Sequence, residues 1–277
     1  MNQINILNTK VHDITMAETI KIVGNFISLR KPHQIVTVNP EMIVAAQSDN
    51  KFNKIINNSN LVIPDGTGLL WAASFTGQHL TERVTGIDLV NQLANLAAKK
   101  RYSIYLLGAM PGVAKKASEI LVNKYPGLKI AGYSSDNPVI NFPDKPEYKF
   151  PYNNRTTDIK PSIANPNLKI VNKIRLTKPD ILLVAYGHVK QEKFIAQYSK
   201  LLNIPVMIGV GGAFDFIVGI AIRAPRIFQK FGLNYLGFEW LWRLITEPKR
   251  FKRIFTAVIV FPWLVFIDII LHKNQIK

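Results

Sequence analysis

The chain has 277 residues and 48% of them are apolar, which suits a sizeable folded core and excludes a disordered chain. There is no cysteine, so disulfides, thiolate metal sites and cysteine nucleophiles are excluded. The formal charge of +17 favours a polyanionic partner, such as nucleic acid, anionic lipid or a phosphorylated substrate.

Strands and helices are expected to alternate along most of the chain. The short β-branched runs that predict strands are 34–39, 60–64, 102–108, 128–132, 180–187 and 205–212. The stretches with helical spacing are 40–52, the residues after Gly68, 85–100 with Thr85 as N-cap, 110–125, 165–178 and 190–202. This alternation predicts an α/β fold: a Rossmann-like, mostly parallel sheet with helices on both faces.

Two segments differ from this rhythm. Residues 133–166 carry six prolines among polar residues, which indicates a long loop or insertion. From Arg223 onward, ten basic residues face only three acidic ones. We therefore predict a catalytic α/β domain over 1–222 and a basic, apolar, helical appendage over 223–277.

The appendage is expected to associate with a membrane. An amphipathic helix over 238–255 should be kinked or split at Pro248. The apolar run 254–271 follows, with eighteen residues at the lower edge of spanning length. Nearby tryptophans and basic residues favour an interfacial or re-entrant anchor, while a full span and a helix buried against a partner subunit are the alternatives. The N-terminus has no signal-peptide pattern, so the expected location is the cytoplasmic face of the membrane.

Asp65 directly follows the expected strand 60–64 and precedes a Gly-Thr-Gly run. In a parallel sheet, ligands bind at the carboxyl ends of the strands, so this carboxylate could act as a general base in a crevice. An aspartate at this position is also typical of an Asx turn or a helix cap. The residue pattern alone leaves both interpretations open.

Further candidates for substrate binding also follow predicted strands or begin helices. They are Thr37, Asn39, Arg83, Gln191, Gly108 and Gly211. Backbone N–H groups at glycine turns can hold a diphosphate, although neither glycine run matches a dinucleotide or P-loop motif. The simpler interpretations are a helix cap for the polar strand ends, a solvated arginine, and ordinary first-turn chemistry for Gln191.

A metal site is not predicted. No Asp-x-Asp pair occurs, and the five histidines lack the spacing of metal ligands. An enzyme that handles a diphosphate without a metal needs cationic side chains to stabilise the leaving group. The C-terminal candidates for this role, or for binding a lipid diphosphate, are Arg223, Arg226, Arg243, Arg250 and Arg253. No cofactor is expected.

Several motifs, taken in order over about residues 35–255, resemble the WecG/TagA/CpsF family of bacterial glycosyltransferases. The motifs are TVNPEMIVAA, VIPDGTGLLWAA, ERVTGIDLV, LLGAMPGV, PDILLVAYGHVKQEKFI, IGVGGAFDFIVG and FEWLWRLITEPKR. Three features depart from the usual pattern: the long 133–166 loop, His188-Val189 where a small residue and proline are common, and the apolar extension after EPKR.

The resemblance implies an inverting, metal-independent transfer from a UDP-sugar to N-acetylglucosamine on undecaprenyl diphosphate. The sugar would be N-acetylmannosamine or its uronic acid, for teichoic acid or another cell-surface polysaccharide. It further implies that Asp65 is the base, that Thr37 and Asn39 line the sugar pocket, and that Arg83 holds a phosphate or sugar oxygen. Gln191 would contact donor or acceptor, and the C-terminal arginines would neutralise the departing UDP.

Two other functions are compatible with the sequence. One is a basic nucleic-acid-binding protein, although no nucleic-acid motif is present and the apolar run has no purpose there. The other is a membrane-associated scaffold that has lost catalysis. The expected partners are therefore a UDP-sugar, a polyprenyl-diphosphate-linked acceptor and an anionic membrane, and not nucleic acid; the oligomeric state stays open, with a homo-oligomer among the alternatives.

Overall fold

The structure is a computed structural model of the whole chain, and it describes residues 1–138, 166–223 and 239–273. Most of the predicted 133–166 insertion lies outside the described residues, as does Arg226. The side chain of Arg243 also falls outside the description, although its backbone is helical.

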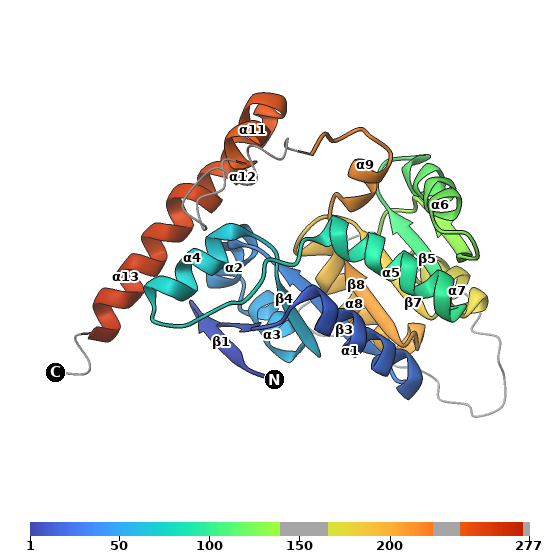
Figure 1. Cartoon of the computed structure of the whole chain (residues 1–277), viewed down its shortest axis with the longest axis horizontal. Coiled ribbons are helices and arrows are strands. Elements are labelled where there is room, and N and C mark those ends of the chain that lie inside the picture. Colours follow the sequence, from blue (N-terminus) through green and yellow to red (C-terminus); the bar gives the residue numbers. More distant parts are fainter. Residues whose placement is uncertain (139–165, 224–238, 274–277) are drawn as a thin grey trace.

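A six-stranded parallel sheet forms the centre of the molecule (Figure 1). Its strand order is β4-β3-β8-β7-β5-β6. The strands are β3 (His33–Val38), β4 (Leu61–Pro64), β5 (Ser103–Gly108), β6 (Lys129–Ser134), β7 (Ile181–Ala185) and β8 (Val206–Gly209). All six predicted strands are present, which confirms the α/β fold.

The sheet is buried on both faces because apolar side chains alternate between them. Along β7, Ile181 and Leu183 enter one core, while Leu182 and Val184 enter the other. One face is covered by α1 (Met16–Leu29), α5 (Gly86–Lys100) and α6 (Val113–Lys124). The other is covered by α2 (Pro40–Ser48), α3 (Asn50–Asn58), α4 (Thr67–Phe75), α7 (Pro166–Thr177) and α8 (Lys190–Leu202).

The expected helix over 40–52 is wrong in one respect, because the structure has two helices there. Asp49 separates α2 from α3, and its side chain accepts a hydrogen bond from the Phe52 N–H at 2.9 Å. Short polar side chains such as those of Ser48, Asp49 and Asn50 compete with the helical backbone for hydrogen bonds, which favours a cap here.

The N-terminal residues form elements that the sequence analysis did not predict. Strands β1 (Gln3–Ile6) and β2 (Thr9–His12) pair as an antiparallel hairpin, and α1 follows. The His12 Nδ1 atom lies 3.0 Å from the backbone nitrogen of Val62 on the edge strand β4. The hairpin therefore attaches to the outer strand of the sheet, where unpaired backbone groups would otherwise be exposed.

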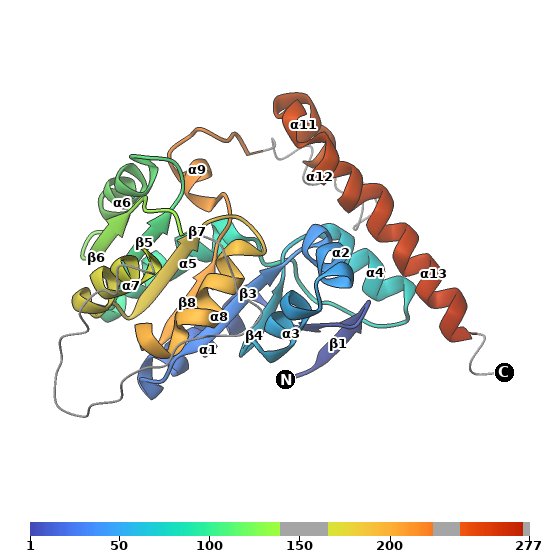
Figure 2. The ribbon, with the colours of Figure 1, turned by 180° about the vertical axis from the view of Figure 1, so that it is seen from behind.

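The described part of the appendage, residues 239–273, is helical, and Pro248 divides it as predicted. Its elements are α11 (Glu239–Thr246), the 3₁₀ turn η1 (Pro248–Arg250), α12 (Phe251–Phe255), the π turn η2 (Thr256–Val260) and α13 (Phe261–Lys273). The last three run on as one long helix beside α2 and α4, at the end of the molecule that carries β4 (Figures 1 and 2). Phe261 and Val265 are buried against these two helices.

The other face of this long helix is apolar and exposed. The exposed side chains, which we call the apolar stripe, recur every three or four residues from Phe251 and are Phe251, Phe255, Ile259, Trp263, Phe266 and Ile270. Among the described residues, Phe251–Leu271 is the one helix long and apolar enough to cross a membrane by length and composition. Only 17% of its most apolar window is buried, so the helix is not a core element of the α/β domain.

Candidate active site

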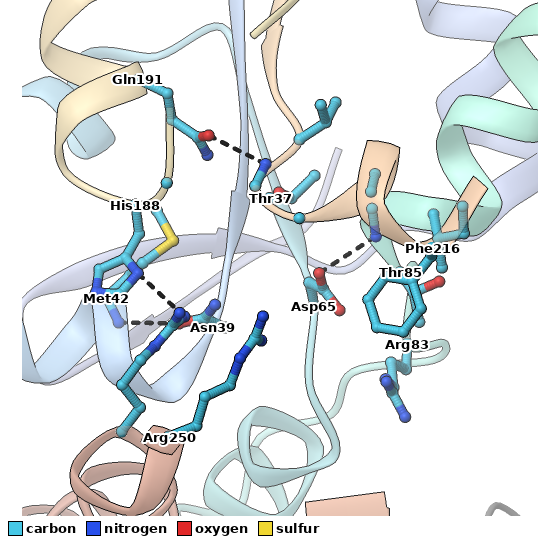
Figure 3. A pocket seen from close by; sticks show the side chains of 18 of the residues that line it. Thr37, Asn39, Met42, Asp65, Arg83, Thr85, His188, Gln191, Phe216 and Arg250 are labelled. Atoms are coloured by element: carbon cyan, nitrogen blue, oxygen red, sulfur yellow. Dashed lines mark hydrogen bonds between the residues drawn. The ribbon is translucent and has the colours of Figure 1, made fainter. Parts of the chain in front are cut away.

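One pocket opens where β3, β4 and β8 end, and the C-terminal helices border it (Figure 3). This is the edge at which parallel sheets bind ligands. The predicted site residues that line it are Thr37, Asn39, Asp65, Arg83, Gln191, Gly211, Arg223, Arg250 and Arg253. Residues from six separated parts of the sequence thus meet around one space.

Asp65 does not cap the helix that follows it. The N-cap of α4 is Gly66, which makes no side-chain cap bond. The Asp65 Oδ2 atom instead accepts a hydrogen bond from the Gly86 N–H, 3.2 Å away in the first turn of α5 (Figure 3). A helix N-terminus favours negative charge, so this position stabilises the ionised carboxylate.

The direction of the chain after Asp65 depends on a glycine. Gly66 has a φ of 146°, in a region that side-chain-bearing residues rarely adopt. A Cβ at this position would also lie 3.0 Å from the Pro40 Cδ atom. The glycine therefore allows β4 to turn sharply into α4 and leaves the Asp65 carboxylate directed into the pocket.

Thr37 and Asn39 hold the backbone around the pocket as well as lining it. The Thr37 hydroxyl donates to the carbonyl of Gly209 at the end of β8, at 3.1 Å. The Asn39 side-chain oxygen accepts from the Met42 N–H at 3.0 Å and caps α2. The helix-cap interpretation is therefore correct for Asn39, and the cap places its carboxamide at the pocket wall.

Arg253 joins the appendage to the α/β domain inside the pocket. Its Nε atom donates to the Glu41 carboxylate on α2 at 2.6 Å, and its NH2 group lies 3.2 Å from Nδ1 of His188. Burial and the adjacent guanidinium lower the pKa of His188, against the smaller opposing effect of Glu41. The imidazole is thus neutral at physiological pH, and its Nδ1 accepts the hydrogen bond from Arg253.

Arg223 and Arg250 are also held by carboxylates. Arg223 donates two hydrogen bonds of 2.7 Å to Asp88 in the first turn of α5. Burial acts to raise the pKa of Asp88, but the bonds from Arg223 and Thr85 outweigh it and the pKa is lowered. Arg250 pairs with Glu247 at 2.5 Å on the same turn of the appendage.

The pocket lining is strongly basic. It includes the four arginines at positions 83, 223, 250 and 253, and Asp65 is the single carboxylate among the described lining residues. Arginine guanidinium groups bind phosphate oxygens in a planar, two-bonded geometry. Across the described ranges, no three His, Asp or Glu side chains gather in a way that could hold a metal ion. The pocket therefore brings one carboxylate together with four guanidinium groups, three of which also pair with carboxylates outside the lining.

Comparison with known proteins agrees with this chemistry. The family model for the WecG/TagA/CpsF glycosyl transferases matches residues 4–275. The chain belongs to this family. Its members include an N-acetylglucosaminyldiphosphoundecaprenol N-acetyl-beta-D-mannosaminyltransferase of Bacillus subtilis, 35% identical over 79% of this chain and 73% of the relative. An enzyme of the same name from Staphylococcus aureus is 28% identical over 91% of this chain and 88% of the relative.

Membership of the WecG/TagA/CpsF family confirms the prediction of a glycosyltransferase and gives no support to a nucleic-acid-binding function. The family match spans residues 4–275, so it includes both the sheet and the described C-terminal helices. The pocket of this family member is therefore where its transfer chemistry should be sought.

Among the predicted site residues that the structure fully describes, Gly108 is the one that does not line this pocket. It ends β5 with a φ of 99°, and a Cβ there would lie 2.8 Å from the Ala185 carbonyl oxygen on β7. The close approach of two strand ends explains the glycine by packing. Its predicted contact with substrate stays a prediction.

Sequence reasoning missed several residues that complete the site. Met42, Thr85, His188 and Phe216 also line the pocket. His188 lies in the departure from the family motif, and the residue after it, Val189, has a φ of 69°. A β-branched residue adopts this conformation at a cost of about 1–3 kcal/mol. The signal available in the sequence was the pair His188-Val189 itself, which stands where a small residue and proline are common in the family motif.

Proposed function

We propose that the protein transfers N-acetylmannosamine from a UDP-sugar to N-acetylglucosamine carried on a polyprenyl diphosphate. The main observation in support of this proposal is the pocket that Asp65 lines together with arginines from the C-terminal segment. The names of the relatives from Bacillus subtilis and Staphylococcus aureus support the sugar and the lipid-linked acceptor. The uronic acid of N-acetylmannosamine is the second donor to be tested.

In the proposed reaction, an acceptor hydroxyl attacks the anomeric carbon of the donor. The new glycosidic C–O bond forms as the bond from that carbon to the UDP oxygen breaks, and a single displacement inverts the configuration. The Asp65 carboxylate accepts the hydroxyl proton, a step whose general-base contribution is typically ~10²–10⁴-fold. The Gly86 N–H bond at 3.2 Å keeps Asp65 oriented during this step.

The leaving UDP carries away negative charge, which the arginines are placed to neutralise. Arg223, Arg250 and Arg253 reach the pocket from the C-terminal segment, and their side chains are between 28% and 45% exposed. Preorganised cations of this kind stabilise a departing diphosphate electrostatically. We therefore propose that the reaction does not require a divalent metal.

The apolar stripe supports a peripheral position on the membrane. A helix with one exposed apolar face and nearby basic residues lies in the interface rather than across it. Phe261 and Val265 tie the opposite side of the same helix to the α/β domain. This arrangement would hold the pocket arginines close to the surface from which a lipid-linked acceptor is presented, and we place the enzyme at the cytoplasmic face.

Substitution of Asp65 tests the proposal. Asp65→Asn should lower kcat at least about a hundredfold, because an amide cannot accept the hydroxyl proton. Turnover is measured with UDP-N-acetylmannosamine and an undecaprenyl-type acceptor in EDTA, with the product read by mass spectrometry. Donor binding is measured in parallel and should change little.

The matched control is Glu119→Gln, which alters a carboxylate on the exposed surface of α6. It should leave turnover unchanged. Near wild-type turnover of Asp65→Asn would remove Asp65 as the base. Loss of wild-type activity in EDTA that returns with Mg²⁺ would contradict metal independence, and transfer from neither donor would contradict the proposed substrate class.

A further inference from the structure

A fully buried carboxyl group lies directly behind the pocket. Glu192, in the first turn of α8, is 0% exposed and does not itself line the pocket. Its Oε1 atom accepts a hydrogen bond from the Gln191 Nε2 group at 2.7 Å. Its Oε2 atom forms no well-aligned hydrogen bond with the described residues. A carboxyl group in such a place costs folding free energy, so its presence calls for a role in function.

Glu192 determines which way the Gln191 carboxamide faces. Gln191 is 2% exposed, and its Oε1 atom accepts from the Gly211 N–H at 3.0 Å (Figure 3). A rotation of this amide by half a turn would place its oxygen against the Glu192 oxygen and its NH₂ against the Gly211 N–H. Both contacts would be repulsive while Glu192 presents an acceptor oxygen, so the Gly211 N–H and the Glu192 carboxyl group select the same orientation.

The same pair is packed tightly against strand β8. A Cβ on Gly209 would lie 2.5 Å from Gln191 Nε2 and 2.6 Å from Glu192 Oε1. The residues that follow, Val210 to Gly212, line the pocket. Thr37 bonds the Gly209 carbonyl from the other side. The turn after β8 is therefore fixed from β3 by a hydroxyl and from α8 by the Glu192–Gln191 pair.

We propose that Glu192 is a positioning residue for sugar transfer, which acts through Gln191 to hold the 210–212 turn against the substrate. The proposal rests on the function proposed above. It assigns no contact with substrate to Glu192. It requires that the effect of Glu192 disappears once Gln191 can no longer transmit it.

A double-mutant cycle with a conservative rescue tests the role of Glu192. Glu192→Leu removes the acceptor and should lower kcat about tenfold, as expected for one buried hydrogen bond, with KM for the donor changed less than kcat. Glu192→Gln keeps an oxygen that can accept from Gln191 and should recover most of the turnover. In the Gln191→Ala background, Glu192→Leu should have almost no further effect.

If Glu192→Leu lowers kcat equally with and without Gln191, the carboxyl group acts by another route and the proposal is overturned. The proposal is likewise overturned if Glu192→Gln is as inactive as the leucine variant while both remain folded by circular dichroism. Glu119→Gln again serves as the control for a carboxylate that is not buried.

Amide hydrogen exchange at Gly211 supplies a readout that does not need turnover. Exchange should be faster in Glu192→Leu than in the wild type, and nearly unchanged in Glu192→Gln. Unchanged protection of Gly211 in a folded leucine variant would overturn the proposal. If the wild type transfers no sugar yet the exchange pattern appears, the proposed substrate is wrong while the action of Glu192 on the turn stands.

Discussion

The carboxyl groups of Asp65 and Glu192 both lie near the pocket, but their surroundings differ in hydrogen bonding and burial. Asp65 follows β4, and its carboxylate accepts a hydrogen bond from the Gly86 N–H in the first turn of α5. The pocket lining around it contains four arginines. Glu192 lies in the first turn of α8, where burial raises the pKa of its carboxyl group to about 7. Hydrogen bonding from Gln191 and from the backbone N–H groups of Glu192 and Val189 only partly opposes that increase. One group is thus suited to accept a proton, and the other changes its charge near physiological pH.

The raised pKa of Glu192 predicts a pH-dependent stability. The folded pKa of about 7 exceeds the ordinary 4.5, so the folded state binds more protons in this range. Stability from this group is complete below pH 4.5 and is lost as pH rises through 7. Glu192→Gln does not ionise, so its free energy of unfolding should exceed that of the wild type increasingly from pH 5 to 8. Between pH 5 and 8, the difference in free energy of unfolding between Glu192→Gln and the wild type should grow by up to about 3 kcal/mol.

Urea unfolding of both proteins at pH 5, 6, 7 and 8 measures the difference. A difference that stays constant with pH would show that Glu192 has the same charge in the folded and unfolded chains. Because other titrating groups are shared by the two proteins, their contributions cancel in the comparison.

At the scale of elements, the appendage is attached to the α/β domain by two kinds of contact. Phe261 and Val265 supply apolar packing against α2 and α4, and Arg253 supplies an ion pair with Glu41. The glycine at 68 permits close packing here, because a Cβ would lie 2.9 Å from Pro40 and 3.8 Å from Phe261. Packing holds the helix in place, while the ion pair locates one arginine within the pocket.

Loss of the Glu41 charge should therefore affect activity more than stability. The pair is partly exposed and is worth roughly 0.2–1 kcal/mol. Glu41→Gln should lower kcat/KM by up to about fivefold and increase amide exchange in α12, because Arg253 is less firmly held. Steady-state kinetics and hydrogen exchange measure the two effects.

Glu119→Gln is the matched control for Glu41, since it breaks an exposed pair with Lys115 whose N–O distance is 3.9 Å. It should alter neither quantity. Equal kinetics and equal α12 exchange for Glu41→Gln and the wild type would mean that packing alone positions Arg253.

At the scale of the whole molecule, the apolar stripe and two of the pocket arginines lie on the same C-terminal segment. The apolar stripe starts at Phe251, next to Arg250, and Arg253 in the same helix turn reaches Glu41. The segment that exposes the apolar stripe thus also brings Arg250 and Arg253 to the pocket. In the proposed function, attachment to the membrane and completion of the site involve the same segment.

Substitutions in the stripe should separate these two roles. Ile259, Trp263 and Phe266 are at least half exposed. The triple change of these residues to serine should weaken binding to anionic vesicles at least about tenfold, because less apolar surface can enter the lipid. Activity on a short-chain, water-soluble acceptor should persist, since the pocket arginines are untouched. Vesicle sedimentation and turnover are measured on the same preparations.

Leu29→Ser and Leu176→Ser together provide the control, because both leucines are exposed and lie on α1 and α7, away from the stripe. They should leave vesicle binding unchanged. Unaltered vesicle binding after the triple change would instead favour contact of this helix with another protein chain.

The sequence by itself determined the elements and their order, because strand and helix patterns are local. Short β-branched runs, the Thr85 cap and Pro248 each act within a few positions, and all six strands of the parallel sheet were predicted. Where local chemistry gave weak signals, prediction failed, as at the cap formed by Asp49 and the N-terminal hairpin.

Only the tertiary structure decided how the site is assembled, because its decisive contacts join distant positions. Asp65 meets Gly86, Arg223 meets Asp88, and Arg253 meets Glu41 across 212 residues of sequence. Burial of Glu192 was equally hidden, since an acidic residue in a first helical turn is normally solvated. Local patterns specify what each segment forms, whereas the charge and orientation of a side chain depend on neighbours that folding brings to it.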